Sequence, residues 1–222
     1  MIHSIIFIIL AYLLGSIPFG YLITRLFIGK NILEIGWKKT SGSNVFKNVG
    51  KLQGTLTGVL DIFKGWLAVW LAQYFGLSPQ IQALCGVAAV TGHNWSCFLR
   101  FAGGRGIGTL MGALFALSPV ILIFSLIPLI FLTLIWNAAI GTILSLMTAI
   151  LLFWHYGQIT TLGLLPLVSL VPVFLKRLSP LKEISSKNRK IILNRLIFDN
   201  NETLLDIRIK RIIKKLTPFR NF

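Results

Sequence analysis

The stretch VILIFSLIPLIFLTLIW, which runs from Val120 to Trp136, contains no charged residue and only two hydroxyl groups. An α-helix of about 20 such apolar residues crosses the roughly 30 Å hydrocarbon core of a bilayer. The sequence therefore predicts an all-α, polytopic membrane protein with about seven transmembrane helices. The other predicted spans are Ile2–Phe27, Thr55–Phe75, Ile81–Leu99, Ile107–Leu117, Ala138–Trp154 and Ile159–Leu175.

The composition of the chain agrees with a membrane location. Its 222 residues are 55% hydrophobic with a mean hydropathy of +0.80, which is too apolar for a soluble α/β domain. With only 6 Asp and Glu, we expect no carboxylate-rich metal, glycosidase or calcium site, and no cofactor. The two cysteines, Cys85 and Cys97, are expected to be packing residues rather than disulfide or zinc ligands.

The distribution of charge predicts how the chain threads the membrane. Of the 22 Lys and Arg residues, five lie in the loop 28–53, two in the loop 100–106 and thirteen in the tail from Lys176, while the opposite connections hold none. Basic residues stay on the cytoplasmic side. We therefore expect an external N-terminus, a seven-span membrane domain over residues 1–175 and a basic cytoplasmic tail over residues 176–222. The first span lacks a basic n-region, so we interpret it as a membrane helix rather than a cleaved signal peptide.

The tail has a helical pattern of its own. Between Leu204 and Leu216, Leu and Ile recur near helical spacing and basic residues occupy most of the remaining surface. This pattern predicts an amphipathic helix that lies on an anionic membrane surface. Nucleic-acid binding is the competing explanation for a pI near 10.5, but the chain has no basic patch interleaved with aromatic residues.

The loop 28–53 contains a candidate anion site. Small and hydroxyl-bearing residues run from Thr40 to Asn44, and Lys47 and Lys51 follow them. Converging backbone amides, hydroxyl groups and lysines suit a phosphate group. A flexible linker with a positive-inside bias would contain similar residues, and this alternative stays open for the loop taken alone.

A second polar segment is more specific. The motif Gly92-His93-Asn94-Trp95 precedes a cluster of four glycines around Arg105, between Gly103 and Gly108, at the start of a predicted helix. Free amides, a positive helix end and a guanidinium fork can all bind one phosphate group. No Walker A loop occurs, so nucleotide hydrolysis is not indicated. His93 could act as a base, but a lone histidine at a helix end is more often structural.

Two charged residues interrupt the second predicted span. Asp61 and Lys64 are three residues apart and therefore lie on one helical face. Charges in hydrocarbon are costly, so we expect them to form an ion pair and to support a functional site. Thr142, near the start of the sixth span, adds a hydroxyl group.

These segments together resemble a known family, the bacterial acyl-phosphate:glycerol-3-phosphate acyltransferases of the PlsY type. The resemblance is carried by Tyr12–Gly20, Ser43-Asn44-Val45 with Gly50-Lys51, Asp61–Gly65, and above all Gly92–Trp95 and Phe98–Gly106; it is fainter from Thr109 to about Glu202. It implies transfer of a fatty acyl group from acyl phosphate to the sn-1 hydroxyl of glycerol 3-phosphate, forming lysophosphatidic acid. The implied partners are these two substrates and membrane lipids, without nucleic acid or metal. The implied location is the plasma membrane, with the site on its cytoplasmic side.

The resemblance also suggests roles for individual residues, none of them a catalytic group of the protein. We expect a substrate phosphate oxygen to act as the base, because no histidine is followed by an aspartate five residues later. Trp37, Lys39, Lys47 and Arg105 depart from the usual family pattern. The hypothesis assigns Ser41, Ser43, Asn44, Gly103, Gly104 and Arg105 to the acyl phosphate, Lys47, Lys51, Arg100, Asn194 and Arg195 to glycerol 3-phosphate, and Asp61, Lys64, His93 and Thr142 to supporting positions.

Another function stays open at this point. A small transporter or channel for phosphorylated or anionic solutes would use the same basic loops. The absence of an internal repeat and the scarcity of ionisable groups within the spans count against it. A CDP-alcohol phosphotransferase would need several aspartates on facing helices, and the spans contain only Asp61.

Overall fold

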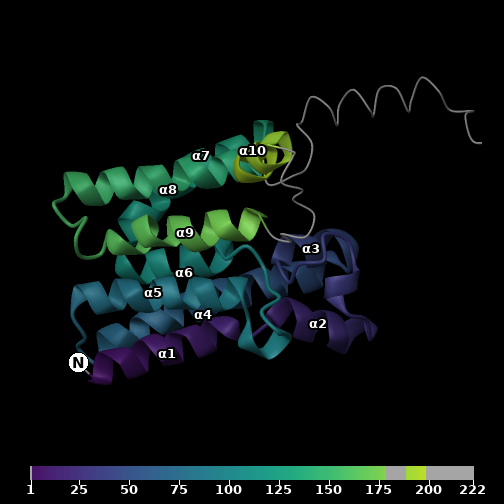
Figure 1. Ribbon diagram of the computed structural model, residues 1–222, viewed down its shortest axis with the longest axis horizontal. Helices are drawn as coiled ribbons and strands as arrows, with labels where there is room; N and C mark the ends of the chain where they lie inside the picture. Colours follow the sequence, from purple (N-terminus) through teal and green to yellow (C-terminus); the bar gives the residue numbers. More distant parts are fainter. Residues whose placement is uncertain (1, 179–188, 199–222) are drawn as a thin grey trace, which may run out of the picture.

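The computed structural model describes residues 2–178 and 189–198, and over these ranges the chain is helical without a β-strand. Figure 1 shows the long helices side by side along the longest axis of the molecule. The helices are α1 (Ile2–Ser16), α2 (Phe19–Ile28), η1 (Ile32–Glu34), α3 (Gly42–Asn48), α4 (Lys51–Tyr74), α5 (Pro79–Asn94), η2 (Cys97–Leu99), α6 (Ile107–Leu117), α7 (Pro119–Ile135), α8 (Ala138–His155), α9 (Leu164–Leu178) and α10 (Arg189–Phe198).

The helical, membrane-type architecture predicted from the sequence is confirmed in its coarse features. Three segments are long and apolar enough to cross a membrane, Ile2–Ile28, Lys51–Tyr74 and Ala138–His155, and α6 and α7 are shorter apolar helices. The number of crossings and the side on which each terminus lies remain predictions. The predicted amphipathic helix of the tail lies outside the described residues.

The boundaries differ from the predicted spans where local chemistry stops a helix. Pro18 separates α1 from α2, because proline has no N–H to donate and disfavours helix in the preceding residue. Helix α5 ends at Asn94 rather than Leu99. A tight turn follows it, in which the amide of Ser96 donates to the carbonyl of Ala102. Apolar periodicity alone does not reveal either end.

The surface of the bundle is apolar and its core is rich in small residues. Large side chains such as Ile123, Ile127, Phe131 and Leu134 on α7 are exposed, whereas many core positions between the helices are alanines. Soluble proteins rarely expose apolar patches of this extent. This distribution suits a bundle whose outer face contacts lipid tails.

Glycines allow α4 and α6 to approach closely. A Cβ atom on Gly65 would collide with the backbone carbonyl of Thr109, and one on Gly112 would collide with that of Ile62. Without a hydrophobic driving force between helices in lipid, such close backbone packing supplies much of the association energy. It also fixes the start of α6 next to the middle of α4.

One end of the bundle gathers the short helices and the basic residues. Figure 1 shows α2, α3 and α10 at the end opposite the N-terminus. The connections at the N-terminal end, residues 75–78 and 156–163, contain no Lys or Arg. The basic loops therefore meet at one face of the described structure, as the charge pattern indicates.

Replacing Gly65 by alanine tests the α4–α6 contact. Gly65→Ala should destabilise the protein by about 1–3 kcal/mol, because the added methyl group meets backbone that cannot move independently. Gly58→Ala in the same helix is the matched control, since a Cβ there meets nothing within 4 Å. Thermal unfolding in detergent would measure both; equal midpoints for the two variants would contradict the packing argument.

Candidate active site

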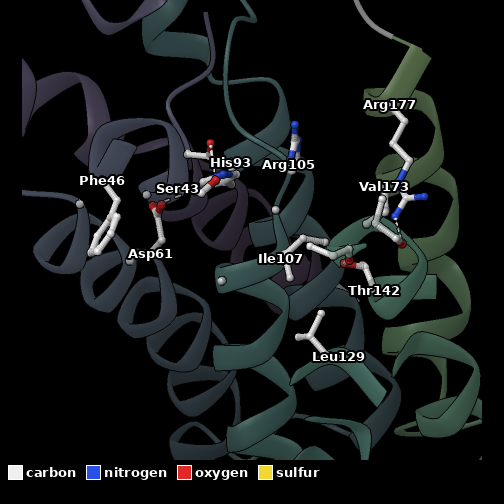
Figure 2. Close-up of a pocket in the computed structure, with 18 of the residues that line it drawn as sticks. Ser43, Phe46, Asp61, His93, Arg105, Ile107, Leu129, Thr142, Val173 and Arg177 are labelled. Atoms are coloured by element: carbon white, nitrogen blue, oxygen red, sulfur yellow. Dashed lines mark hydrogen bonds and ion pairs between the residues drawn. The ribbon is translucent and has the colours of Figure 1, made fainter. Parts of the chain in front are cut away.

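A cavity of about 470 Å³ opens at the basic end of the bundle between α3, α4, α6, α8 and α9. Figure 2 shows Ser43 and Asp61 close together on one side, Arg105 across from them, and Leu129 below. The lining residues are Ser41, Gly42, Ser43, Phe46, Lys47, Gly54, Gly58, Asp61, His93, Arg105, Gly106, Ile107, Gly108, Leu129, Ala138, Ala139, Thr142, Val173 and Arg177.

The polar part of the cavity combines hydroxyl groups with the start of a helix. Ser41 and Ser43, whose Oγ atoms are 3.4 Å apart, lie at the beginning of α3. Gly106, which lines the same cavity, is in the left-handed conformation at φ 77° and begins α6 without a side-chain cap. Its uncapped amides and positive dipole end favour an anion at this position.

Two cations near the opening share one aromatic ring. The Cζ atom of Arg105 lies 5.4 Å from the centre of the Trp37 ring, and the Nζ atom of Lys47 lies 5.0 Å from it. Cation–π attraction of this kind restrains both side chains. Trp37 itself does not line the cavity, so its effect on a ligand is through these two cations.

A buried charge network forms the wall beneath the serines. The Oδ1 atom of Asp61 lies 2.9 Å from the Nζ atom of Lys64 and 3.3 Å from the Nδ1 atom of His93. Lys64 also donates to the carbonyl of Ile17 at 2.9 Å, at the break between α1 and α2. The predicted ion pair is therefore present, and it joins three helical segments. Asp61 and His93 line the cavity, whereas Lys64 lies behind them.

Gly103 and Gly104 serve the packing of this wall. The amide of Gly104 donates to the carbonyl of His93 at 3.0 Å. A Cβ atom on Gly104 would overlap the His93 ring, and one on Gly103 would overlap the carbonyls of His93 and Asn94. Neither glycine lines the cavity. Gly106 and Gly108, two and four residues after Gly104, do line it.

Asn44 lies outside the cavity, fully buried beneath the loop. Its side chain accepts a hydrogen bond from the amide of Trp37 and donates to the carbonyls of Ile35 and Lys39. It thereby fixes the loop that carries Ser41 and Ser43.

The other predicted residues divide between the cavity and its surroundings. Lys47 and Thr142 line the cavity. Lys51 and Arg100 are exposed and do not line it. Asn194 and Arg195 are buried in α10, where Arg195 donates to the carbonyl of Leu178 at 3.1 Å.

Arg177 lines the cavity and was not predicted as a site residue. It donates to the carbonyl of Ala139 at 2.8 Å and to that of Leu196 at 2.6 Å, and so connects α9 with α8 and α10. Figure 2 shows its side chain extending along Val173 toward the cavity. In the sequence, Arg177 is marked only as a basic residue close after an apolar run. The same pattern occurs wherever a basic residue sets membrane topology, so it does not identify a site residue.

The far end of the cavity is apolar. Ile107 and Leu129 line it, and a smaller cavity of about 20 Å³ shares Ile107, Leu129 and Thr142 with it. A ligand that fits this shape has an anionic head and an apolar tail. Among the described residues, no group of three or more His, Cys, Asp or Glu side chains could hold a metal ion.

Comparison with known proteins places this geometry in context. The model of a family described as glycerol-3-phosphate acyltransferase matches residues 5–185. The glycerol-3-phosphate acyltransferase of Helicobacter acinonychis is 38% identical over 124 residues, which cover 53% of this chain and 56% of that protein. The glycerol-3-phosphate acyltransferase 1 of Dehalococcoides mccartyi is 38% identical over 154 residues, covering 66% of this chain and 74% of that protein. The match thus spans about half the length of the Helicobacter relative.

Two solved structures are similar over nearly the whole fold. Both are crystal structures of PlsY (YgiH), an integral membrane glycerol 3-phosphate acyltransferase. The glycerol 3-phosphate form has a TM-score of 0.73 and 26% identity, over 93% of this chain and 98% of that chain. The lysophosphatidic acid form has a TM-score of 0.70 and 26% identity, over 93% and 99%.

The charge network of the site can be tested by its effect on stability. Asp61→Asn should cost about 3–5 kcal/mol, because it leaves the Lys64 ammonium buried without a counter-charge. Adding Lys64→Met to Asp61→Asn should recover part of this loss, since both charges are then gone. Thermal unfolding of the two variants measures the difference. A double variant less stable than Asp61→Asn would show that the buried ammonium group of Lys64 does not need the counter-charge of Asp61.

Proposed function

The chain belongs to the glycerol-3-phosphate acyltransferase family, and on this premise we propose that it transfers a fatty acyl group from acyl phosphate to glycerol 3-phosphate. The acyl group goes to the sn-1 hydroxyl, and the product is lysophosphatidic acid. The observation that carries the proposal is the shape of the cavity, in which hydroxyl groups, Arg105 and the start of α6 lie above an apolar end. An acyl phosphate has the same division into an anionic head and an apolar chain.

The donor's phosphate belongs at the polar end of the cavity. Ser41 and Ser43 can donate hydrogen bonds to it from the start of α3, and Arg105 can donate from the loop before α6. The amides of Ile107 and Gly108 add the positive end of the α6 dipole. The acyl chain then extends past Ile107 toward Leu129.

The reaction needs positioning more than it needs a protein base. The sn-1 hydroxyl oxygen attacks the acyl carbonyl carbon, an ester C–O bond forms, and the bond between that carbon and the bridging phosphate oxygen breaks. Inorganic phosphate leaves, and a phosphate oxygen takes the proton of the hydroxyl group. Because the anhydride is already activated, holding both substrates in line and stabilising the leaving phosphate can supply the rate enhancement.

His93 is poorly placed to act as the base. One edge of its ring faces Asp61 at 3.3 Å, and its Nε2 edge packs against Gly104. Both edges of the ring are therefore committed to the wall of the cavity. This arrangement supports a substrate phosphate oxygen as the proton acceptor.

The location follows from the proposed function together with the charge distribution. We place the protein in the cytoplasmic membrane of a bacterium as a multi-pass protein with an external N-terminus and its site on the cytoplasmic side. In this proposal residues 1–175 form the membrane domain and residues 176–222 form a basic tail. The clustering of basic residues at the end that holds the cavity supports this orientation. The alternative function, transport of anionic solutes, is less well supported. The family membership favours acyl transfer, and so does a cavity with one polar and one apolar end.

The choice of donor tests the proposal directly. The purified protein in lipid should form lysophosphatidate from labelled glycerol 3-phosphate when palmitoyl phosphate is supplied. Palmitoyl-CoA and palmitoyl-acyl-carrier protein, offered in parallel, should give none. Product from a thioester would overturn the donor, and no product from any donor with folded protein would overturn the function.

Among the residues assigned to the donor's phosphate, Arg105 should contribute most to its binding. Arg105→Ala should lower kcat/KM for palmitoyl phosphate by about 10- to 100-fold, because a charge-assisted hydrogen bond to phosphate is lost. Arg105→Lys should lose less, since it keeps the charge but not the fork. Lys30→Ala, which removes an exposed charge at the same end, is the control. Wild-type kinetics in Arg105→Ala would contradict this placement of the donor.

A further inference from the structure

The turn of residues 97–101, between α5 and α6, presents an apolar and basic surface that the proposed function does not use. Phe98 is 59% exposed and Phe101 is 63% exposed, and Arg100, which lies between them in the chain, is exposed as well. None of the three lines the cavity. A role in the cavity therefore does not account for the charge of Arg100 or for the two rings.

The backbone of this turn has an unusual conformation. Arg100 and Phe101 are consecutive residues at φ 50° and φ 62°, in the left-handed region that residues with a side chain seldom adopt. The carbonyl of Ser96 closes the turn by accepting from the amide of Leu99 at 3.1 Å and from that of Phe101 at 2.8 Å. Such strain persists only where neighbouring contacts maintain it, and it is concentrated in functional segments. In this turn it leaves both rings and the guanidinium group exposed.

Hydrogen bonds fasten the base of the turn to α1. The Ser96 hydroxyl donates to the carbonyl of Ser16 at 2.6 Å, and the Tyr12 hydroxyl donates to the carbonyl of Trp95 at 2.7 Å. Figure 1 shows this connection, in teal, beside the end of α1 that leads to α2. The 97–101 turn therefore has a fixed position on the side of the bundle.

The position of the turn along the bundle matches the edge of the hydrocarbon. Helix α5 starts at the N-terminal end of the bundle and has 16 residues, so it rises about 24 Å. The hydrocarbon core of a bilayer is about 30 Å thick. Because the turn follows α5 directly, it lies where the chain leaves the hydrocarbon at the basic end. Phenylalanine rings can enter the boundary between acyl chains and headgroups there, while an arginine beside them reaches the headgroup phosphates.

The charge of the turn favours an anionic surface. The described part of the chain contains two carboxylates, and neither forms an ion pair with Arg100. Asp61 belongs to the buried charge network, and Glu34 accepts a hydrogen bond from Asn31. The cytoplasmic leaflet carries anionic headgroups, and a phosphate can accept two hydrogen bonds from one guanidinium group. An anionic lipid can therefore supply a counter-charge for Arg100.

We propose that the 97–101 turn is an interfacial anchor, in which Phe98 and Phe101 insert at the level of the lipid glycerol groups and Arg100 pairs with the phosphate of an anionic phospholipid. This inference goes beyond the proposed function and depends only on the membrane orientation given there. Two residues after Phe101, Gly103 begins the segment that packs against His93. The anchor thereby fixes the height of the loop before α6 relative to the membrane surface.

The depth of the turn can be measured with a reporter on Cys97. Cys97 is exposed, whereas Cys85, the other cysteine of the sequence, is fully buried. A bimane fluorophore on Cys97 of the full chain in lipid nanodiscs should be quenched more strongly by bromine near the glycerol end of the lipid chains than by bromine at mid-chain. Ile127→Cys in a Cys97→Ser background, on the exposed face of α7, should show the reverse order. No quenching at Cys97, or quenching that is equal or stronger from mid-chain bromine, would overturn the anchor.

Arg100→Gln tests the choice of lipid. With bimane on Cys97, brominated anionic lipid should associate with the wild-type turn about fivefold more strongly than brominated zwitterionic lipid, the preference expected for one basic residue at an anionic surface. Arg100→Gln should lose most of this preference. Lys30→Gln, which removes another exposed charge at the same end, should keep it. The same preference in Arg100→Gln as in the wild type would show that Arg100 does not bind the lipid.

Removing the rings tests the insertion itself. The double variant Phe98→Ser, Phe101→Ser should lose most of the quenching of bimane on Cys97, and its thermal unfolding midpoint should change little because both side chains are exposed. Full quenching in the folded double variant would contradict insertion by the rings. These measurements use no substrate, so they are independent of acyl transfer. An inactive protein with an anchored turn would refute the proposed function alone, and an active protein with an unquenched reporter would refute the anchor alone.

Discussion

The buried contact between Asp61 and Lys64 is the interaction on which the candidate site depends. At the break around Pro18, the carbonyl of Ile17 accepts hydrogen bonds from the amide of Phe19 at 3.2 Å and from the ammonium group of Lys64 at 2.9 Å. Asp61 neutralises Lys64 and contacts His93, whose ring in turn packs against Gly104. A single chain of polar contacts thus joins α1, α4, α5 and the loop before α6 inside an otherwise apolar bundle.

This network also explains why the cavity has two different ends. The loop before α6 is held against His93, so α6 begins beside the middle of α4, and its first residues line the same cavity as the serines of α3. Below that level the lining is mostly apolar, with Leu129 and Ile107 beside the hydroxyl group of Thr142. An anionic head group is therefore stabilised at one depth and an acyl chain at another, which orients an amphipathic donor before any chemistry begins.

The sequence predicted the helical class, the polar face and several cavity residues, because apolar runs, charge bias and glycine motifs are local signals. Ser41, Ser43 and Arg105 do line the cavity. Asn44 and Gly104 carry the same chemistry as ligand-binding residues, but tertiary contacts use them to fix the loop and the wall. The spacing of residues in the sequence could not predict which role they have, since an amide side chain or a glycine can either bind a ligand or hold a loop in place. Likewise, Lys47 and Arg105 both lie over the ring of Trp37. All three residues depart from the family pattern, and only the folded chain shows that they are in contact.

The central claim is that one cavity holds the donor with its phosphate at the α6 start and its chain toward Leu129. Photolabelling tests it most directly, using a non-hydrolysable acyl phosphonate with a diazirine at the end of the chain. The account predicts cross-links to α6, α7 and α8 near Ile107, Leu129 and Thr142, and their loss when palmitoyl phosphate competes. Labelling confined to the outer faces of the bundle, without competition, would contradict it.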